Sequence, residues 1–201
     1  MNPLDLIHLQ ITLEYQLDPA GNLVPFAGSS EQARYIIYKY QGGYRRYYRY
    51  DLPIQVTSQL AEKDARSAFE QPEQVINILS QDGPVHPSGP FVSGYFNHIP
   101  VLGEYSLVQL LDGCFVIVVG NQPVAQAWSE RCNERCAEVA VETLPEFRQC
   151  GYARQVTAAW ANSTINQGRL AFYSYKADNL PSRALANSLD VVQYAVCMVF
   201  N

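Results

Sequence analysis

Residues 148–153 combine residue types that could hold an anion. They read Arg-Gln-Cys-Gly-Tyr-Ala, between an alternating stretch at 138–143 and a helix-like run at 152–167. The first amides of a helix lack intrahelical partners, and the helix dipole favours negative charge there. Gly151 lets the backbone approach a ligand because it has no Cβ, and Arg148 adds a positive charge. Taken alone, this short stretch is better explained as an ordinary strand-to-helix turn, since short motifs often match by chance.

The elements around this turn predict a mixed sheet. An apolar run bounded by glycines is typical of a buried strand, and alternating apolar residues indicate further strands. Strands are predicted at 114–119, 124–131, 137–143, 169–175 and 191–200, and helices at 152–167 and 180–189. Pro145 ends the strand before the turn, and Gly168 ends the helix after it. This order gives one parallel crossover around the anion-binding turn.

The N-terminal half contains an unusual segment rich in tyrosine and arginine. Within residues 33–50, two tyrosine-rich runs flank Gly42-Gly43. This pattern predicts a β-hairpin, because glycine supplies the positive φ of a tight turn. Helices are predicted at 51–65 and 72–80. Residues 5–17 alternate in part between apolar and polar residues, which favours a strand or an irregular edge segment.

Residues 82–90 are expected to form a linker. They hold three prolines and two glycines, which predicts that they lack regular structure. This places the boundary between an N-terminal α+β half, residues 1–90, and a second domain, residues 91–201. His98 and Glu104 follow in a predicted loop, without a motif that assigns them a role.

The tyrosine/arginine hairpin at 33–50 has two interpretations. It could be a basic aromatic platform for stacking nucleobases, as in single-strand binders. It could also be a half-buried hairpin whose charged side chains point to water, lining a substrate groove or a dimer contact. The net charge of −5 favours the second interpretation and disfavours nucleic acid as a partner.

The composition is that of a globular protein. Of the 201 residues, 48% are hydrophobic, which argues against disorder. The N-terminus shows no signal-peptide pattern, and the longest apolar run, 114–119, is too short to span a membrane. The five cysteines are scattered without zinc-binding spacing. We therefore expect a cytoplasmic protein with reduced thiols and no metal.

Three segments in register resemble the GNAT superfamily of acyl-CoA-dependent N-acyltransferases. Its signature, Arg or Gln, two residues, Gly, one residue, then Gly or Ala, stands here at residues 148–153. The preceding Val-Glu-Thr-Leu-Pro-Glu-Phe, at 141–147, has the form usual before this turn. The segment Asn179-Leu-Pro-Ser182 matches the start of the later helix. The resemblance covers residues 107–200, and the N-terminal half looks more loosely like a group of little-characterised bacterial GNAT proteins.

The resemblance implies an α/β (α+β) fold: a mixed, mostly antiparallel sheet with a splayed parallel strand pair, flanked by helices. It implies that residues 91–201 bind acetyl-CoA and that residues 1–90 lie on the acceptor side. The pyrophosphate would be held by backbone amides of Gln149, Cys150, Gly151, Tyr152, Ala153 and Arg154, with Arg148 beside them. The pantetheine arm would pair with the backbone of Val141, Glu142 and Thr143 and contact Asn179 and Ser182.

The resemblance also implies the chemistry, in which an amine of a small molecule attacks the thioester directly. The amine must lose a proton, so a base is needed. Glu138 stands where some family members carry that base, and Glu142 falls on the same strand face if no bulge intervenes. Many members carry a tyrosine as general acid seven residues after the asparagine, where this chain has Ala186. That departure keeps open a catalytically inactive acyl-CoA-binding protein or an interaction module that uses the hairpin. A homodimer is also left open.

Overall fold

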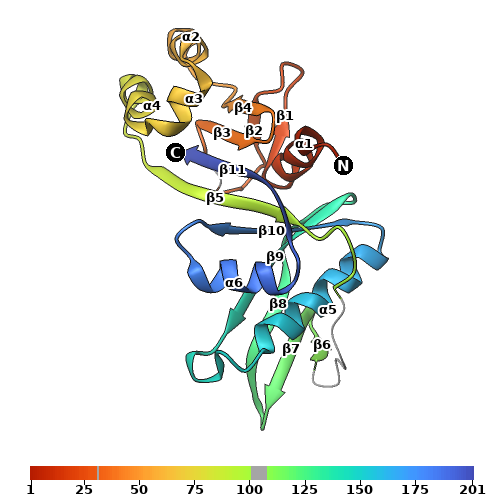
Figure 1. Ribbon diagram of the computed structural model, residues 1–201. Helices are drawn as coiled ribbons and strands as arrows, with labels where there is room; N and C mark the ends of the chain where they lie inside the picture. Colours follow the sequence, from red (N-terminus) through yellow and green to blue (C-terminus); the bar gives the residue numbers. More distant parts are fainter. Residues whose placement is uncertain (31, 101–107) are drawn as a thin grey trace. The chain divides into compact units, whose positions relative to one another are not determined.

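The computed structural model describes residues 1–30, 32–100 and 108–201 (Figure 1). Contacts divide the chain into two compact units, one made of residues 1–92 and 194–201 and the other of residues 93–193. The C-terminal residues therefore group with the N-terminal part of the chain. Two strands, β5 (Pro87–Tyr95) and β11 (Val192–Phe200), have residues in both units.

The first unit is built on antiparallel strands with helices around them. Its helices are α1 (Pro3–Glu14), α2 (Ile54–Glu62), α3 (Ala65–Glu70) and α4 (Pro72–Leu79), followed by a 3₁₀ turn at Ser80–Asp82. Its other strands are β1 (Tyr15–Leu17), β2 (Leu23–Pro25), β3 (Tyr35–Tyr40) and β4 (Gly43–Tyr48). The strand order is β4-β3-β11-β5, with β1 and β2 forming a separate pair. The predicted tyrosine-rich hairpin is confirmed. Strands β3 and β4 pair with Tyr35 opposite Tyr48 at one end and Tyr40 opposite Gly43 at the turn.

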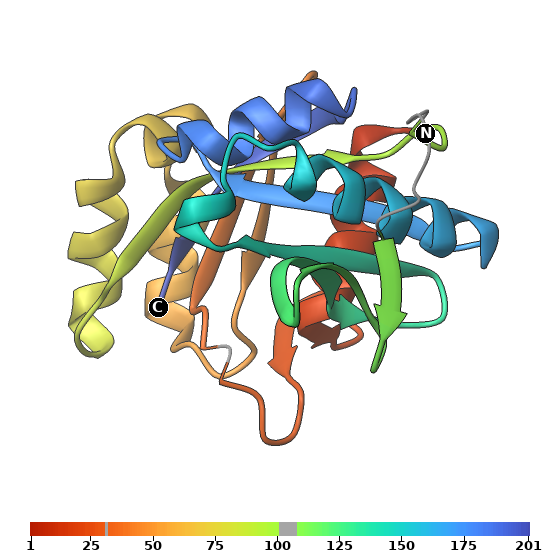
Figure 2. The ribbon, with the colours of Figure 1, turned by 90° about the horizontal axis from the view of Figure 1, so that it is seen from below.

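The core of the first unit lies between these strands and helices α2, α3 and α4. Side chains of Tyr35, Ile37 and Phe200 leave one face of β3 and β11 and pack on apolar side chains of the three helices. Helix α1 lies on the other side of these strands (Figure 2). Burial, with Cys197 and Glu14 nearby, raises the pKa of Tyr38. Hydrophobic burial on both sides thus holds the hairpin and β11 in place.

Replacing Tyr35 with phenylalanine is expected to stabilise the first unit. Tyr35 is 0% exposed, and its hydroxyl has no hydrogen-bond partner among the described residues. Burial also raises its pKa. An unsatisfied buried polar group costs about 1–3 kcal/mol, so its removal should raise the free energy of unfolding by about 1 kcal/mol. Urea unfolding measures this free energy, with Tyr48→Phe as the control variant. An unchanged or lower urea midpoint for Tyr35→Phe would contradict the prediction.

The prediction of a strand or edge segment at 5–17 was wrong for most of its length. Residues Pro3–Glu14 form α1, which begins with Asn2 as its N-cap, and the Asn2 side chain accepts a hydrogen bond from the amide of Leu4 at 3.0 Å. Pro3 in the first turn and Asp5 after it are typical helix-start residues. Buried residues occupy most of the circumference of this helix, so no apolar stripe with helical period marks it in the sequence.

The linker predicted at 82–90 is partly regular, because β5 begins at Pro87. His86 and Asn201 exchange two backbone hydrogen bonds, of 2.9 and 3.2 Å, which start the pairing with the end of the chain. A Cβ built on Gly89 would lie 3.0 Å from the backbone oxygen of Cys197. Glycine therefore permits a close approach between β5 and β11. In the sequence pattern, the same glycine had indicated a segment without regular structure.

The positive charges of the tyrosine/arginine segment are engaged within the first unit. Arg46 donates to the backbone oxygens of Leu60 and Ala61 at 3.0 and 3.1 Å and so caps the end of α2. The guanidinium of Arg45 lies 5.1 Å from the ring centre of Tyr47, and Lys39 lies 3.7 Å from Glu70. These contacts favour the structural interpretation of the hairpin over a platform for nucleobases.

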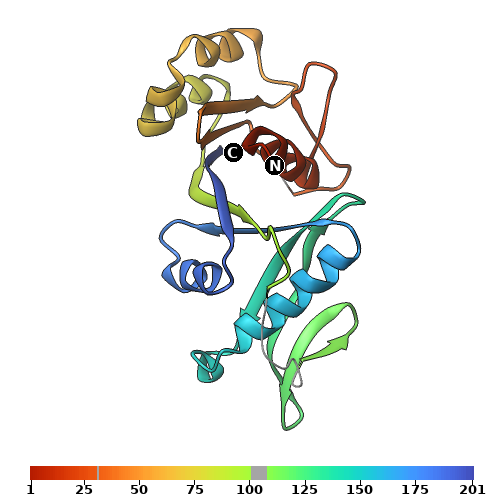
Figure 3. The ribbon, with the colours of Figure 1, turned by 45° about the vertical axis from the view of Figure 1, so that its right-hand side comes forward.

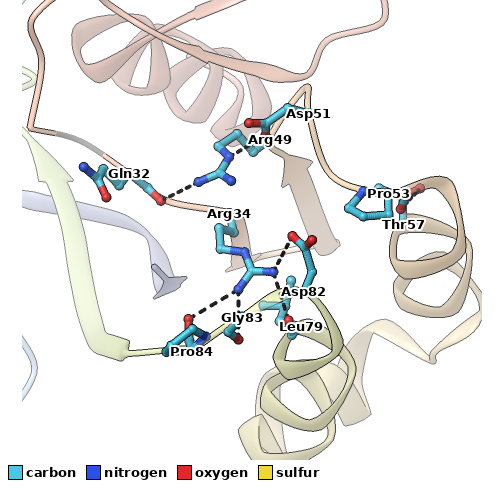
Figure 4. Close-up of polar contacts among 10 residues, drawn as sticks. All are labelled: Gln32, Arg34, Arg49, Asp51, Pro53, Thr57, Leu79, Asp82, Gly83 and Pro84. Carbon is cyan, nitrogen blue, oxygen red and sulfur yellow. Dashed lines mark hydrogen bonds and ion pairs between the residues drawn. The ribbon is translucent and has the colours of Figure 1, made fainter.

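Arg34, just before β3, joins this hairpin to the end of α4 (Figure 4). Its Nη2 donates to Asp82 Oδ2 at 2.8 Å and to the backbone oxygen of Leu79 at 2.9 Å. Its Nη1 lies 3.5 and 3.4 Å from the backbone oxygens of Gly83 and Pro84. One buried side chain thus binds the last turn of α4 and the segment after it.

The second unit carries the strands and helices of the predicted crossover. They are β6 (Val108–Leu111), β7 (Cys114–Val119), β8 (Gln122–Cys132), β9 (Cys136–Thr143), α5 (Tyr152–Asn166), β10 (Leu170–Lys176) and α6 (Leu180–Ser188). The strand order is β10-β9-β8-β7-β6. The order predicted from the sequence is confirmed, with the short edge strand β6 in addition. Helix α5 lies along β7, β8 and β9 (Figure 3).

The sheet of the second unit is antiparallel except for one pair. Strands β9 and β10 run parallel. Their pairing begins with Cys136 opposite Leu170 and ends with Glu138 opposite Phe172. Strand β9 continues to Thr143 and β10 to Lys176, so the two separate beyond Glu138 and Phe172. The predicted fold class, a mixed, mostly antiparallel α/β sheet with a splayed parallel pair and flanking helices, is confirmed.

Candidate functional site

The turn between β9 and α5 leaves a row of backbone amides available. After a 3₁₀ turn at Pro145–Phe147, Gln149 has a φ of 63° and Gly151 a φ of 77°, and Gly151 is the N-cap of α5. In the parts of the chain that the structure describes, no acceptor takes a hydrogen bond from the amides of residues 149–154. These amides and the positive end of the helix dipole suit an anionic ligand.

Gly151 is required here for its backbone conformation. A φ of 77° is in the left-handed region, which costs an L-residue about 1–2 kcal/mol. A Cβ built on Gly151 would meet no heavy atom within 4 Å, so neighbouring protein atoms do not exclude a side chain. That open space lies against the turn where a ligand would approach.

Two guanidinium groups lie at this turn, and both also hold it in place. Arg148 is exposed, and its Nε donates to the backbone oxygen of Thr143 at 3.4 Å. Arg154, in the first turn of α5, donates from its Nε to the backbone oxygen of Ser188 at the end of α6, at 3.1 Å. The exposed Cys150 thiol lies 3.6 Å from the backbone oxygen of Arg148. The turn therefore carries two positive charges, and their hydrogen bonds connect it to the end of β9 and to the end of α6.

The remaining side chains of the turn pack locally. Tyr152 is half-buried, and its ring centre lies 6.5 Å from that of Phe147. Ala153 is half-buried in the first turn of α5, while Gln149 is exposed. The groups that this stretch offers to an anionic ligand are therefore its backbone amides and its two arginines.

The end of β9 offers a strand edge. Val141, Glu142 and Thr143 pair with β8 on one side, and in the described residues β10 no longer pairs with them on the other. The hydroxyl of Thr143 is buried and has no partner within the described parts of the chain. An extended polar ligand could pair with this free edge as an added strand would. The orphaned hydroxyl and the unpaired amides fit an acyl-CoA arm and its pyrophosphate.

Asn179 and Ser182 lie together at the start of α6. The Asn179 side-chain oxygen accepts a hydrogen bond from the amide of Ser182 at 3.1 Å, which caps the helix. The Ser182 hydroxyl lies 3.2 Å from the hydroxyl of Tyr173 in β10. The asparagine predicted to contact a ligand arm is therefore also the residue that begins this helix.

Glu138 lies on the face of the sheet opposite α5. Trp160 of α5 donates to Ser129 Oγ at 2.9 Å, and Ser129 is the partner of Val139 across the β8–β9 ladder. Side chains alternate along a strand, so Val139 points toward α5 and Glu138 points away from it. Glu138 is 6% exposed, and its Oε2 accepts from Arg131 Nη1 at 3.4 Å. It belongs to the last residue pair before β9 and β10 separate.

Glu142 lies on the same face as Glu138 but in a different environment. The register shift in this ladder falls in β8, between Ser129 and Arg131, and leaves the alternation of β9 intact. Glu142 is exposed, and its Oε2 accepts from Gln126 Nε2 at 3.1 Å. Four residues of strand separate the two carboxylates by about 13 Å, too far for both to serve one atom.

Arg131 and Tyr173 were not recognised from the sequence as site residues. The bulge in β8 sets which residue faces Glu138, and no sequence signal gives that register. Tyr173 is a strand residue among several aromatic residues, and only its contact with α6 distinguishes it. Ala186 is 1% exposed, so its methyl group is buried. His98 is exposed, and Glu104 lies outside the described residues.

No group of three or more His, Cys, Asp or Glu side chains within residues 1–30, 32–100 and 108–201 is arranged to hold a metal ion. In the same described ranges, no helix is long and apolar enough to cross a membrane.

Comparison with known proteins finds a family match within the second unit. Residues 113–193 match the sequence model of a family described as GNAT acetyltransferase. This stretch is less than half of the chain, and it contains β9, the turn, α5, β10 and α6. The resemblance to the GNAT superfamily predicted from the sequence is therefore confirmed. No curated protein sequence matches the chain.

Two of the solved structures that match the chain are described as belonging to the GNAT family. A GNAT-family acetyltransferase of Colwellia psychrerythraea has 11% identity and a TM-score of 0.56, with 100% of this chain and 97% of that chain covered. A protein of Novosphingobium aromaticivorans described as a GNAT-family acetyltransferase has 16% identity and a TM-score of 0.49 over 59% of this chain. The present chain covers 65% of the Novosphingobium protein, just under two thirds of its length. At 11% identity the likeness to the Colwellia structure shows the fold alone, and the family match supports acyl transfer in general.

Proposed function

We propose that this protein transfers an acetyl group from acetyl-CoA to an amine of a small molecule. The observation that carries this proposal is the combination of a free β9 edge and an adjacent turn of unpaired amides. These two features lie next to each other along the chain, in the order that an extended arm ending in a pyrophosphate would need. The family match over residues 113–193 supports it.

Each part of the site has a task in this proposal. The amides of residues 149–154 and Arg148 hold the pyrophosphate, while Val141, Glu142 and Thr143 hydrogen-bond the arm through their backbone. Asn179 and Ser182 contact the arm from α6. The bound thioester supplies an activated acyl carbon for attack by the amine.

Glu138 is the proposed base that takes the proton from the attacking amine. Its carboxylate is buried at the point where β9 and β10 separate, and its Oε2 accepts a hydrogen bond from Arg131 Nη1. The exposed Glu142 is the weaker candidate, because its carboxylate lies toward the turn and is hydrogen-bonded by Gln126.

A binding protein without turnover is the alternative, and Ala186 is the observation that favours it. Calorimetric titration with acetyl-CoA tests binding, and release of free thiol in the presence of a broad panel of amines tests turnover. Binding together with thiol release supports the transferase. Binding without release from any amine supports the alternative, and no heat at millimolar acetyl-CoA would remove both.

Replacing Gly151 with valine is expected to weaken acetyl-CoA binding at least about tenfold, or about 1.4 kcal/mol. A β-branched residue at positive φ is strained, so the turn would shift its amides, and the new side chain would occupy the open space there. Calorimetry measures the dissociation constant.

The matched control for this change is Gly168→Val at the other end of α5. Gly168 has the same φ of 77° and the same open surroundings, so its replacement should cost similar stability. It lies away from the turn, and acetyl-CoA affinity should not change. Equal affinity losses in the two variants would show that Gly151 acts only through stability.

A further inference from the structure

We propose that the Tyr173 hydroxyl donates a hydrogen bond to the sulfur atom that leaves as acyl transfer proceeds. This inference rests on the proposed function. It concerns a buried hydroxyl that the steps above do not use, at the place where the parallel strands separate.

The register of β9 and β10 gives Tyr173 its position. Phe172 is the last residue of β10 paired with β9, opposite Glu138, and Tyr173 is the next residue. Partners in a ladder project to one face of the sheet, and successive residues alternate. Phe172 therefore shares the face of Glu138, and Tyr173 points to the face covered by α5. The side chains of Glu138 and Tyr173 therefore project from opposite faces of the sheet, both near the point where β9 and β10 separate.

The contacts of Tyr173 place its hydroxyl at the start of α6. Its Oη lies 3.2 Å from Ser182 Oγ and donates a long hydrogen bond of 3.4 Å to the Ser182 backbone oxygen, which a sulfur atom would replace as the acceptor. Ser182 and Ala186 are four residues apart on one face of α6, and both are small. Ala186 carries no donor, so on this face of the helix Tyr173 and Ser182 supply the hydroxyl groups.

The environment of Tyr173 keeps its hydroxyl protonated. The residue is 2% exposed, and burial raises its pKa, an effect that the Ser182 hydrogen bond opposes and Tyr175 reinforces. A phenol in this state donates a hydrogen bond and does not act as a nucleophile. Its Oη–H group is thus suited to stabilising a negative charge that forms beside it.

The reaction balances with this role. The amine nitrogen forms a bond to the acyl carbon, and its proton passes to Glu138. The carbon–sulfur bond breaks, and its electron pair remains on the sulfur. Tyr173 keeps its proton and donates a hydrogen bond to the resulting thiolate, while Ser182 orients the phenol. The thiolate gains a proton from water on release.

The test compares Tyr173→Phe with Tyr175→Phe. Tyr175 is a suitable control because it is two residues along the same strand, on the same face and 5% exposed, and its hydroxyl accepts a hydrogen bond from Gln193 at 2.9 Å. Each variant loses one buried hydroxyl. The measurements are kcat, the KM for acetyl-CoA, the melting temperature, and the thiol pKa of bound CoA from the ultraviolet absorbance of the thiolate.

Tyr173→Phe should lower kcat about 10- to 100-fold, with the KM for acetyl-CoA changed less than about twofold. It should also raise the thiol pKa of bound CoA by about one unit or more, since a hydrogen bond to the charged thiolate is lost. Tyr175→Phe should leave kcat and the thiol pKa as in the unmodified protein. Ser182→Ala should give a smaller loss of kcat than Tyr173→Phe.

A merely structural Tyr173 would give a different pattern. Its removal would lower the melting temperature while kcat and the thiol pKa stayed unchanged, and that result would overturn the inference. If the unmodified protein bound CoA without turnover, the thiol pKa comparison alone would decide. If it bound no CoA, the proposed function would fail first, so the two failures are distinguishable.

Discussion

Replacing Glu138 with glutamine is expected to lower kcat/KM for acyl transfer about 100-fold or more. General base catalysis contributes typically about 10²–10⁴-fold, and an amide of the same shape cannot take the proton. Glu138 is 6% exposed, and it lies in the last pair before β9 and β10 separate. No other carboxylate on this face of β9 is at that level of the strand.

The matched control is Glu142→Gln, on the same strand and the same face. Glu142 is exposed and lies four residues closer to the turn, so its loss should change kcat/KM less than about threefold. Steady-state kinetics with a responsive amine measures both variants, and calorimetry checks that acetyl-CoA still binds. If Glu142→Gln were the more damaging change, the base would have to be reassigned to Glu142.

Replacing Arg34 with methionine is expected to destabilise the first unit by about 2 kcal/mol, because it removes a buried guanidinium that donates to Asp82 and to the backbone oxygen of Leu79. The Arg34 side chain is 6% exposed and that of Asp82 is 35% exposed. Without the guanidinium, Asp82 loses its counter-charge, and the backbone oxygen of Leu79 loses the hydrogen bond of 2.9 Å from Arg34. For a domain of this size the melting temperature should fall by about 10 °C.

Arg66→Met is the control for the Arg34 prediction. Arg66 also pairs with a carboxylate, Glu70, at 3.1 Å, but its side chain is 72% exposed. Exposed ion pairs contribute little, so the melting temperature should not change measurably. Thermal and urea unfolding compare the two variants. Equal behaviour of Arg34→Met and Arg66→Met would mean that the contacts of Arg34 do not hold the unit together.

The local features of the site could be predicted from the sequence because they depend on neighbours along the chain. Alternation identified β9, Pro145 marked its end, and Gly151 marked the turn. Asn179 followed by a proline marked the start of α6. These signals work because backbone conformation and helix capping are decided within a few residues.

Helix α1 and the start of β5 were misjudged for a different reason. Tertiary packing buries α1 around most of its circumference, which removes the stripe that identifies a helix in a sequence. Strand β5 contains Pro87 and Pro90, and it is regular because β11 supplies a partner and Gly89 permits the close approach. Both depend on contacts with residues distant in sequence.

The sequence by itself determined the strand, the turn and the helix start that suit an acyl-CoA arm. Tertiary structure alone decided which side chains meet where β9 and β10 separate. The bulge in β8 brings Arg131 to Glu138, and the register of β10 points Tyr173 away from Glu138 toward Ser182. Residues 194–201 also join the first unit only through the fold. Strand register is set by long-range pairing and a one-residue shift reverses every side chain, so no local pattern could have placed these groups.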